Sequence, residues 1–216
     1  HESSGAALSQ TLGIGKGSVT LEDFYRTDLV IVVGQNPGTN HPRMLSALAK
    51  AKQGGAKIIS INPLREAGLH TFVDPQSPSS LLSGGQRLSD LYLQVQVNRD
   101  LALFKAILLL LWEREKAAPG TVFDQEFIRM QTAGYADFTA SLADYSVDEL
   151  IAATGLSRAS VEASVELIAT RKKIIICWAM GVTQHRNAVQ TIREIVNLLL
   201  LKGSVGIPGG GTCPVR

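Results

Sequence analysis

The sequence has few residues of the kinds that build metal sites and disulfide frameworks. Only 2 cysteines and 4 histidines occur among 216 residues. Cys177 and Cys213 lack a C-x-x-C spacing, so this chain alone predicts neither an iron–sulfur cluster nor a structural zinc site. No two histidines have the H-x-x-x-H spacing of paired metal ligands. The lack of a disulfide framework is typical of cytosolic proteins, and we expect a cytoplasmic location.

Long apolar runs and a strong charge of one sign are also lacking. The longest apolar run, residues 106–112, is far shorter than the roughly 18 residues that indicate a transmembrane span. The formal net charge is +2, without a basic block that would mark a nucleic-acid surface. We therefore expect neither a membrane nor a nucleic acid as a partner. The chain begins with His1 rather than Met, and we expect it to be a fragment of a longer protein.

The usual motifs of self-contained catalysis and of phosphate binding are missing as well. No G-x-G-x-x-G follows the first predicted strand, and no G-x-S-x-G occurs. Residues 13–18 resemble a phosphate loop superficially, but the spacing is not G-x-x-x-x-G-K-[ST] and no strand precedes them. We expect residues 1–20 and the Gly-rich tail, 203–216, to be loops.

The pattern that is present is an alternation of strands and helices in a chain that is 45% hydrophobic. Apolar runs at 28–34, 56–61 and 173–178 predict strands buried on both faces. A helix at 41–53 is expected to be capped by Thr39 or Asn40 and ended by Gly54 and Gly55. Further elements are expected as strands at 71–73 and 91–97, and as helices at 101–116, 123–130, 136–142, 147–154, 158–170 and 187–202. This order predicts one α/β domain over 1–216, with a mostly parallel, Rossmann-like sheet between helices on both faces, in three layers.

Polar residues follow the predicted strands at the edge where such sheets bind ligands. Asn36, Asn62 and Gln184 offer amides that both donate and accept hydrogen bonds. Asp100 could accept from a base edge or a ribose, and Arg65 could pair with a phosphate. Gly34 and Gly181 would let the backbone approach a ligand closely. Each Asn-Pro segment alone is explained by a turn, but their coincidence at one edge favours a nucleotide-type ligand.

Several segments resemble bacterial formate dehydrogenases and related alpha subunits of the dimethyl sulfoxide reductase superfamily. They are residues 1–5 (HESSG), 27–42 (TDLVIVVGQNPGTNHP), 55–59 (GAKII), 178–184 (WAMGVTQ) and 214–216 (PVR). The resemblance runs, with gaps, over the whole chain. It implies an internal domain of a molybdopterin-dependent oxidoreductase. Ala179 stands where many relatives have Gly, and Cys213 where the formate dehydrogenase pattern has Asn, so the substrate stays open.

The resemblance also implies a cofactor and roles for single residues. The family binds two molybdopterin guanine dinucleotides around molybdenum or tungsten, one of them over the carboxyl edge of this sheet. Its expected contacts are Gly34, Gln35, Asn36, Pro37, Asn62, Arg65, Asp100, Met180, Gly181 and Gln184. His1 resembles the histidine that follows the metal-ligating cysteine or selenocysteine and takes up the substrate's proton. Arg216 resembles the arginine that holds the substrate carboxylate.

The same resemblance sets expectations for the whole protein. The substrate would be formate or a similar small molecule, and the fragment alone would be inactive. A 4Fe-4S cluster would belong to the remaining domains of the parent chain. Because His1 and Arg216 would approach one metal site, the two ends of this chain should lie close together.

Two alternatives remain open. A strand, a Gly turn and an apolar helix in that order also resemble the central domain of thiamine-diphosphate enzymes, which is mainly a structural or nucleotide-binding module. A nicotinamide-dependent dehydrogenase is the other alternative, against which the missing glycine fingerprint argues.

Overall fold

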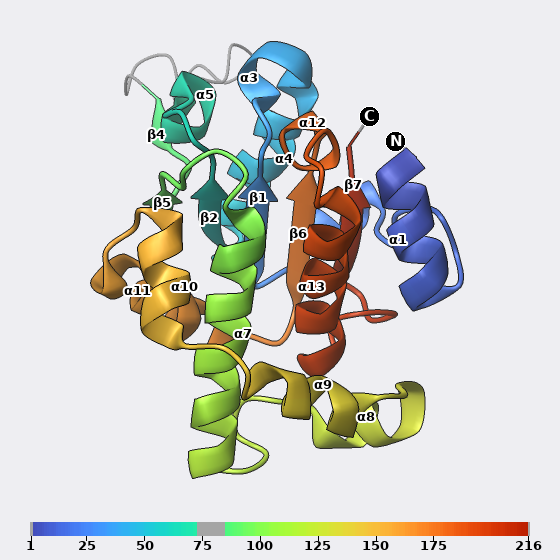
Figure 1. Ribbon diagram of the computed structural model, residues 1–216. Coiled ribbons are helices and arrows are strands. Elements are labelled where there is room, and N and C mark those ends of the chain that lie inside the picture. The colour runs from blue at the N-terminus through green and yellow to red at the C-terminus, as the bar shows by residue number, and fades with distance from the viewer. Residues whose placement is uncertain (1, 73–84, 216) are drawn as a thin grey trace.

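The computed structural model describes residues 2–72 and 85–215, and its centre is a five-stranded sheet (Figure 1). The strand order is β5-β2-β1-β6-β7, and every neighbouring pair runs parallel. The strands are β1 (Leu29–Val33), β2 (Lys57–Ile61), β5 (Leu91–Leu93), β6 (Ile174–Trp178) and β7 (Gly211–Pro214). A separate antiparallel pair joins β3 (Thr71–Phe72) to β4 (Gln86–Arg87). The predicted α/β class and mostly parallel sheet are confirmed.

Helices cover both faces of the sheet because the central strands are buried on both sides (Figure 1). Leu29, Ile31 and Val33 of β1 belong to one core cluster, and Val30 and Val32 belong to the other. The first cluster includes residues of α1 (Glu2–Leu12), α7 (Asp100–Ala117), α8 (Gln125–Gln131), α9 (Tyr135–Leu142), α10 (Val147–Thr154), α11 (Arg158–Ala169) and α13 (Ala188–Leu201). The second includes residues of α2 (Leu21–Phe24), α4 (Pro42–Gln53) and α5 (Ala67–His70).

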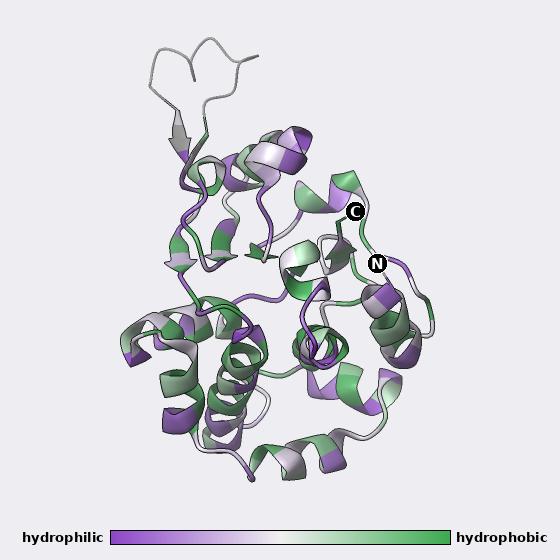
Figure 2. Ribbon diagram, turned by 45° about the horizontal axis from the view of Figure 1, so that its top comes forward, coloured by the Kyte–Doolittle hydropathy of each residue, from purple (hydrophilic) through white to green (hydrophobic). Residues whose placement is uncertain are grey.

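The helix α13 shows why these segments fold as they do. Apolar residues recur along it at helical spacing, and Figure 2 shows it end-on as a largely hydrophobic helix among the others. Ile192, Ile195 and Leu199 are fully buried in the core, and each such side chain stabilises the fold by about 1.5–3 kcal/mol. Polar caps begin other helices: the side chain of Ser146 accepts from the backbone N–H of Glu149, and that of Ser157 accepts from the backbone N–H of Ser160.

The prediction that residues 1–20 form a loop is wrong for the first part of that stretch. Residues Glu2–Leu12 form α1, although the loop expected from residue 13 onward is present. Ala7 and Leu8 of this helix are fully buried in the core. Ser4 accepts a hydrogen bond of 2.9 Å from the indole Nε1 of Trp178. Packing against distant residues thus stabilises a helix whose own Ser- and Gly-rich sequence favours a loop.

The prediction that the tail is entirely loop is also wrong. Residues Gly211–Pro214 form β7, which pairs with β6 at the edge of the sheet. A proline is tolerated there because the outer side of an edge strand needs no ladder donor. The amide of Val215 donates to the carbonyl of Trp178 at 2.8 Å. Since Ser4 also bonds to Trp178, the two ends of the described chain lie close together, as expected (Figure 1).

Two local predictions need correction. Thr39 and Asn40 do not cap the helix over 42–53, because they belong to a separate short helix, α3 (Pro37–Asn40), whose cap is Asn36. His41 is the residue at the N-terminal boundary of α4. The strand expected over 91–97 ends at Leu93. Beyond it the amide of Gln96 donates to the carbonyl of Thr154 in α10 rather than continuing the ladder with β2.

Candidate functional site

A cleft of about 540 Å³ lies at the carboxyl ends of the parallel strands. This volume falls within the roughly 300–1,000 Å³ of small-molecule sites. The residues that line it follow β1, β2, β6 and β7 in the chain. They are Gly34, Gln35, Asn36, Thr39, Asn40, His41, Asn62, Glu66, Ala179, Met180, Gly181 and Val215. The chain thus places a polar cleft where parallel α/β sheets bind ligands.

The cleft lies where the strand order reverses direction. From β1 the chain crosses to β2 on one side, whereas β6 and β7 lie on the other. The segments that follow β1 and β6 meet at Gly34, directly after β1, and at Gly181 in the short helix α12 (Met180–Thr183) after β6. The amide of Gly181 donates to the carbonyl of Gly34 at 3.1 Å. A Cβ atom on Gly34 would lie 2.8 Å from the carbonyl carbon of Gly181. Both glycines are therefore needed for the contact between the segments that follow β1 and β6, whether or not a ligand approaches.

One carboxylate organises the polar side of the cleft. The amide nitrogen of Asn36 donates to Glu66 Oε2 at 2.5 Å, and that of Asn62 donates to Oε1 at 3.4 Å. The amide oxygen of Asn36 is held by the backbone N–H of Thr39. An ionised carboxylate has about four acceptor positions, so Glu66 keeps acceptor capacity for N–H or O–H donors of a ligand.

The side chain of Tyr92 fixes the loop that carries Glu66. Its hydroxyl accepts from the backbone N–H of Glu66 at 3.1 Å and donates to the carbonyl of Leu64 at 2.6 Å. Burial raises the pKa of this phenol, so it keeps the proton with which it donates. Tyr92 is therefore a positioning residue for the carboxylate.

The side chain of Gln35 carries a buried acceptor that lacks a hydrogen bond. Gln35 is 3% exposed and lines the cleft. Its amide nitrogen is 2.9 Å from Sδ of Met44, while its oxygen Oε1 has no hydrogen-bond partner among the described residues. A buried polar atom without a partner costs about 1–3 kcal/mol. A ligand with a donor at this position would recover that free energy.

The electrostatic character of the cleft favours a neutral polar group over a phosphate. Among the described residues that line it there is no Lys or Arg, and Glu66 is acidic. A diphosphate beside this carboxylate would be repelled unless cations from elsewhere compensated. The cleft is therefore suited to a nucleobase or a sugar, which present N–H, O–H and carbonyl groups.

Some of the binding residues predicted from the sequence line the cleft, and the others lie outside its lining. Gly34, Gln35, Asn36, Asn62, Met180 and Gly181 all line the cleft. Pro37 is buried as the first residue of α3. Arg65 is exposed outside the lining, and Gln184 is exposed at the end of α12, 3.7 Å from Sδ of Met180.

Asp100 lies apart from the cleft lining, at the start of α7. It is 3% exposed, its Oδ2 lies 3.8 Å from Nδ1 of His185, and burial raises its pKa. The predicted catalytic residues His1 and Arg216 lie outside the described residues. Of their neighbours, Val215 lines the cleft.

Six lining residues were missed by reasoning from the sequence. They are Thr39, Asn40, His41, Glu66, Ala179 and Val215. Thr39, Asn40, His41 and Glu66 lie in or next to the short helices α3 and α5, which the sequence did not predict. Val215 follows β7, a segment that was expected to be loop, and Ala179 has no polar side chain to single it out. Glu66 follows β2 by five residues and is the most important of these for binding. Its carboxylate accepts hydrogen bonds from the side-chain amides of Asn36 and Asn62, which a solvated surface carboxylate would not do.

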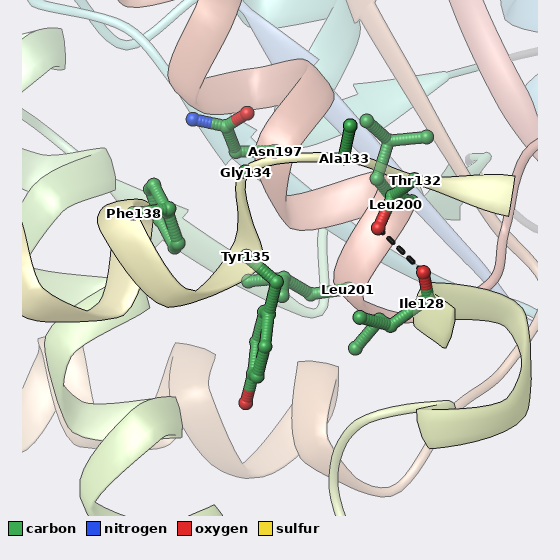
Figure 3. A pocket seen from close by; sticks show the side chains of 9 residues that line it. All are labelled: Ile128, Thr132, Ala133, Gly134, Tyr135, Phe138, Asn197, Leu200 and Leu201. Carbon is green, nitrogen blue, oxygen red and sulfur yellow. Dashed lines mark hydrogen bonds between the residues drawn. The ribbon is translucent and has the colours of Figure 1, made fainter. Parts of the chain in front are cut away.

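Other hollows are less suitable for a nucleotide. Figure 3 shows a pocket of about 40 Å³ between α8, α9 and α13, lined mainly by apolar side chains such as Ile128, Tyr135 and Phe138. It is too small for a nucleotide. A wider hollow of about 750 Å³ between α7, α9 and α13 contains Lys105 and Glu194, which already form an ion pair at 2.9 Å. It lies on the helical face, away from the strand ends.

Within residues 2–72 and 85–215, no group of three or more His, Cys, Asp or Glu side chains is arranged to hold a metal ion. Over the same part of the chain, no helix combines the length and the apolar character needed to cross a membrane.

Comparison with known proteins identifies the family. Residues 3–215 match the family described as molybdopterin oxidoreductase. The chain belongs to the molybdopterin oxidoreductase family. An uncharacterised oxidoreductase of Mycobacterium tuberculosis is 47% identical over 216 residues, which is all of this chain and 28% of that protein. Formate dehydrogenase H of Escherichia coli is 29% identical over 216 residues, or 27% of its length.

Solved structures agree on the fold. Acetylene hydratase from Pelobacter acetylenicus superposes with a TM-score of 0.76 at 18% identity, over 97% of this chain and 25% of that one. The chain thus spans about a quarter of the relatives that it matches. Membership of the family implies a molybdopterin cofactor, and it favours the molybdopterin prediction over the thiamine-diphosphate and nicotinamide alternatives.

Proposed function

We propose that this chain is the domain of a formate-dehydrogenase-like oxidoreductase that holds the guanine nucleoside of one molybdopterin guanine dinucleotide in the cleft. The observation that carries the proposal is the carboxylate of Glu66 between Asn36 and Asn62, in a cleft whose described lining has no Lys or Arg. The family implies molybdopterin, and the proposal adds the guanine dinucleotide form and its position.

Guanine fits this arrangement by its hydrogen-bonding groups. Its edge presents two adjacent N–H donors, and a carboxylate can accept both. Adenine lacks such a pair of donors and would leave the carboxylate partly unsatisfied. The acceptor oxygen of Gln35 would take a further donor from the base or the ribose, and the Asn amides would face the remaining acceptors.

The phosphates and the metal would lie outside this cleft, toward the remaining domains of the whole protein. Arg65 and Gln184 are exposed beside the cleft and are proposed to contact the polar groups that extend from it. When bound, the cofactor supplies a molybdenum or tungsten centre that accepts two electrons from the substrate. The residues of this chain bind and orient its nucleotide end.

The roles of His1 and Arg216 are proposed from the resemblance. His1 would take up the proton released during oxidation, and Arg216 would hold the carboxylate of formate or of a similar small substrate. In support, Ser4 and Val215, near the two ends, both bond to Trp178. The formate assignment is supported by 29% identity to formate dehydrogenase H.

The test is the nucleotide content of the whole protein, purified from cells supplied with molybdate. Glu66→Gln keeps the size of the side chain but replaces one acceptor with a donor. Losing one charged hydrogen bond costs about 1.5–3 kcal/mol, so guanine dinucleotide affinity should fall about tenfold or more. Glu113→Gln, the same change at an exposed position of α7, is the matched control. Equal guanine content in both variants would contradict the proposal.

A further inference from the structure

Two thiols lie side by side at the edge of the central sheet. Cys177 of β6 and Cys213 of β7 are direct partners in the register of these parallel strands. Both contact the core cluster on the α4 side of the sheet, so their side chains project from the same face. Neighbouring strands are about 4.8 Å apart, and disulfides join Cα atoms about 4.4–6.8 Å apart. A disulfide between them would need little movement of the backbone.

The two thiols differ in their access to solvent. Cys177 is fully buried. Cys213 lines an open groove of about 550 Å³, together with Leu21, Phe24 and Val215. This groove is almost entirely apolar, so a small uncharged oxidant can enter it more easily than an anion can. A reagent of that kind would meet Cys213 first.

The two thiols also differ in acidity. A hydrogen bond from the thiol of Cys177 lowers the pKa of Cys213. Burial raises the pKa of Cys177 well above its ordinary value. Since the thiolate is the nucleophile toward peroxides, the groove at Cys213 and its lowered pKa both favour attack by Cys213, and the buried Cys177 lies beside it in the position of a resolving thiol.

We propose that Cys213 and Cys177 form a reversible oxidation site for hydrogen peroxide. The Cys213 thiolate attacks one peroxide oxygen, the O–O bond breaks, and Cys213 becomes a sulfenic acid with release of one water after protonation. The sulfur of Cys177 then attacks the sulfenic sulfur, its proton leaves with the hydroxyl group as a second water, and the disulfide forms. A small dithiol restores both thiols and is itself oxidised to a disulfide.

The site is connected to the cleft but does not depend on the proposed cofactor. Val215 follows Cys213 by two residues and lines both the groove and the cleft. A covalent bond between β6 and β7 would restrain this edge strand and the residues that follow it. The oxidation itself needs only the two thiols and the peroxide.

The test uses the whole protein, reduced and then treated with a small excess of hydrogen peroxide. Peroxide is removed, the protein is denatured in an alkylating reagent, and its peptides are analysed by mass spectrometry. We expect a cross-linked peptide pair containing Cys177 and Cys213, which a dithiol reverses. Full alkylation of both cysteines after peroxide treatment would overturn the proposal.

Two variants separate the roles of the thiols. In Cys177→Ala, Cys213 should be trapped by dimedone as a sulfenic acid, and without dimedone it should over-oxidise to the sulfinic or sulfonic acid. In Cys213→Ala, Cys177 should stay reduced because it is buried. Equal peroxide reactivity of Cys177 in that variant would also overturn the assignment. The wild-type cross-link decides the question even if a variant folds poorly.

Discussion

Replacing Gly34 by Ala is the sharpest test of how the cleft is built. Gly34 has φ +56°, a left-handed conformation that costs a non-glycine residue about 1–2 kcal/mol. The added Cβ would also lie 2.8 Å from the backbone of Gly181, and overpacking of this kind costs about 1–3 kcal/mol. The total expected destabilisation is about 2–5 kcal/mol. The control is Gly120→Ala, where φ is +78° and nothing lies within 4 Å of the new Cβ, so only the conformational cost remains.

Hydrogen exchange measured by mass spectrometry gives the local free energy of opening for β1 and β6, and it can be measured in the whole protein. Relative to Gly120→Ala, Gly34→Ala should lower the free energy of opening of these strands by a further ~1–3 kcal/mol, so their amides should exchange about 5- to 150-fold faster. Equal protection of β1 and β6 in the two variants would refute the argument that the Gly34–Gly181 contact holds together the segments that follow β1 and β6.

Three further predictions concern buried polar groups. Burial lowers the pKa of Lys202 from 10.5 to about 8, so between these pH values the unfolded state binds more protons than the folded state, and the free energy of unfolding rises with pH. Lys202→Met should remove this rise, which amounts to at most about 1.4 kcal/mol per pH unit in urea unfolding. Burial alone would raise the pKa of Glu115, but the backbone N–H groups of Gly120, Val122 and Phe123 outweigh it and lower the pKa. Its stabilisation is therefore present above pH 4.5 and lost as pH falls further, and Glu115→Gln should flatten this acid limb of the unfolding profile. Trp178→Phe removes the bond to Ser4 and should loosen α1 by about 1–3 kcal/mol beyond the general cost of a smaller core side chain, seen as a larger increase of exchange in α1 than in β1 and β2.

Much of the fold could be predicted because its strongest elements carry local signals. The strand 28–34 and the helix 147–154 have continuous apolar runs or caps that need no tertiary context, and both are present. The first helix and β7 could not be predicted in that way. Ala7 and Leu8 are helical because they pack in the core, and Gly211–Pro214 is a strand because β6 offers it a partner.

The candidate site follows the same division. Asn36 and Asn62 could be predicted because they follow buried strands whose carboxyl ends meet at one edge. Glu66 could not, since it enters the cleft only through the fold of its loop, which Tyr92 holds by two hydrogen bonds. Asp100 satisfied the sequence rule, but α7 begins at that residue and buries it beside His185.

The most direct measurement is the metal and guanine dinucleotide content of the whole protein, purified from cells supplied with molybdate. The proposed function predicts molybdenum, or tungsten where that metal is supplied, together with molybdopterin guanine dinucleotide. A well-folded protein that contains neither the metal nor a guanine nucleotide would contradict it.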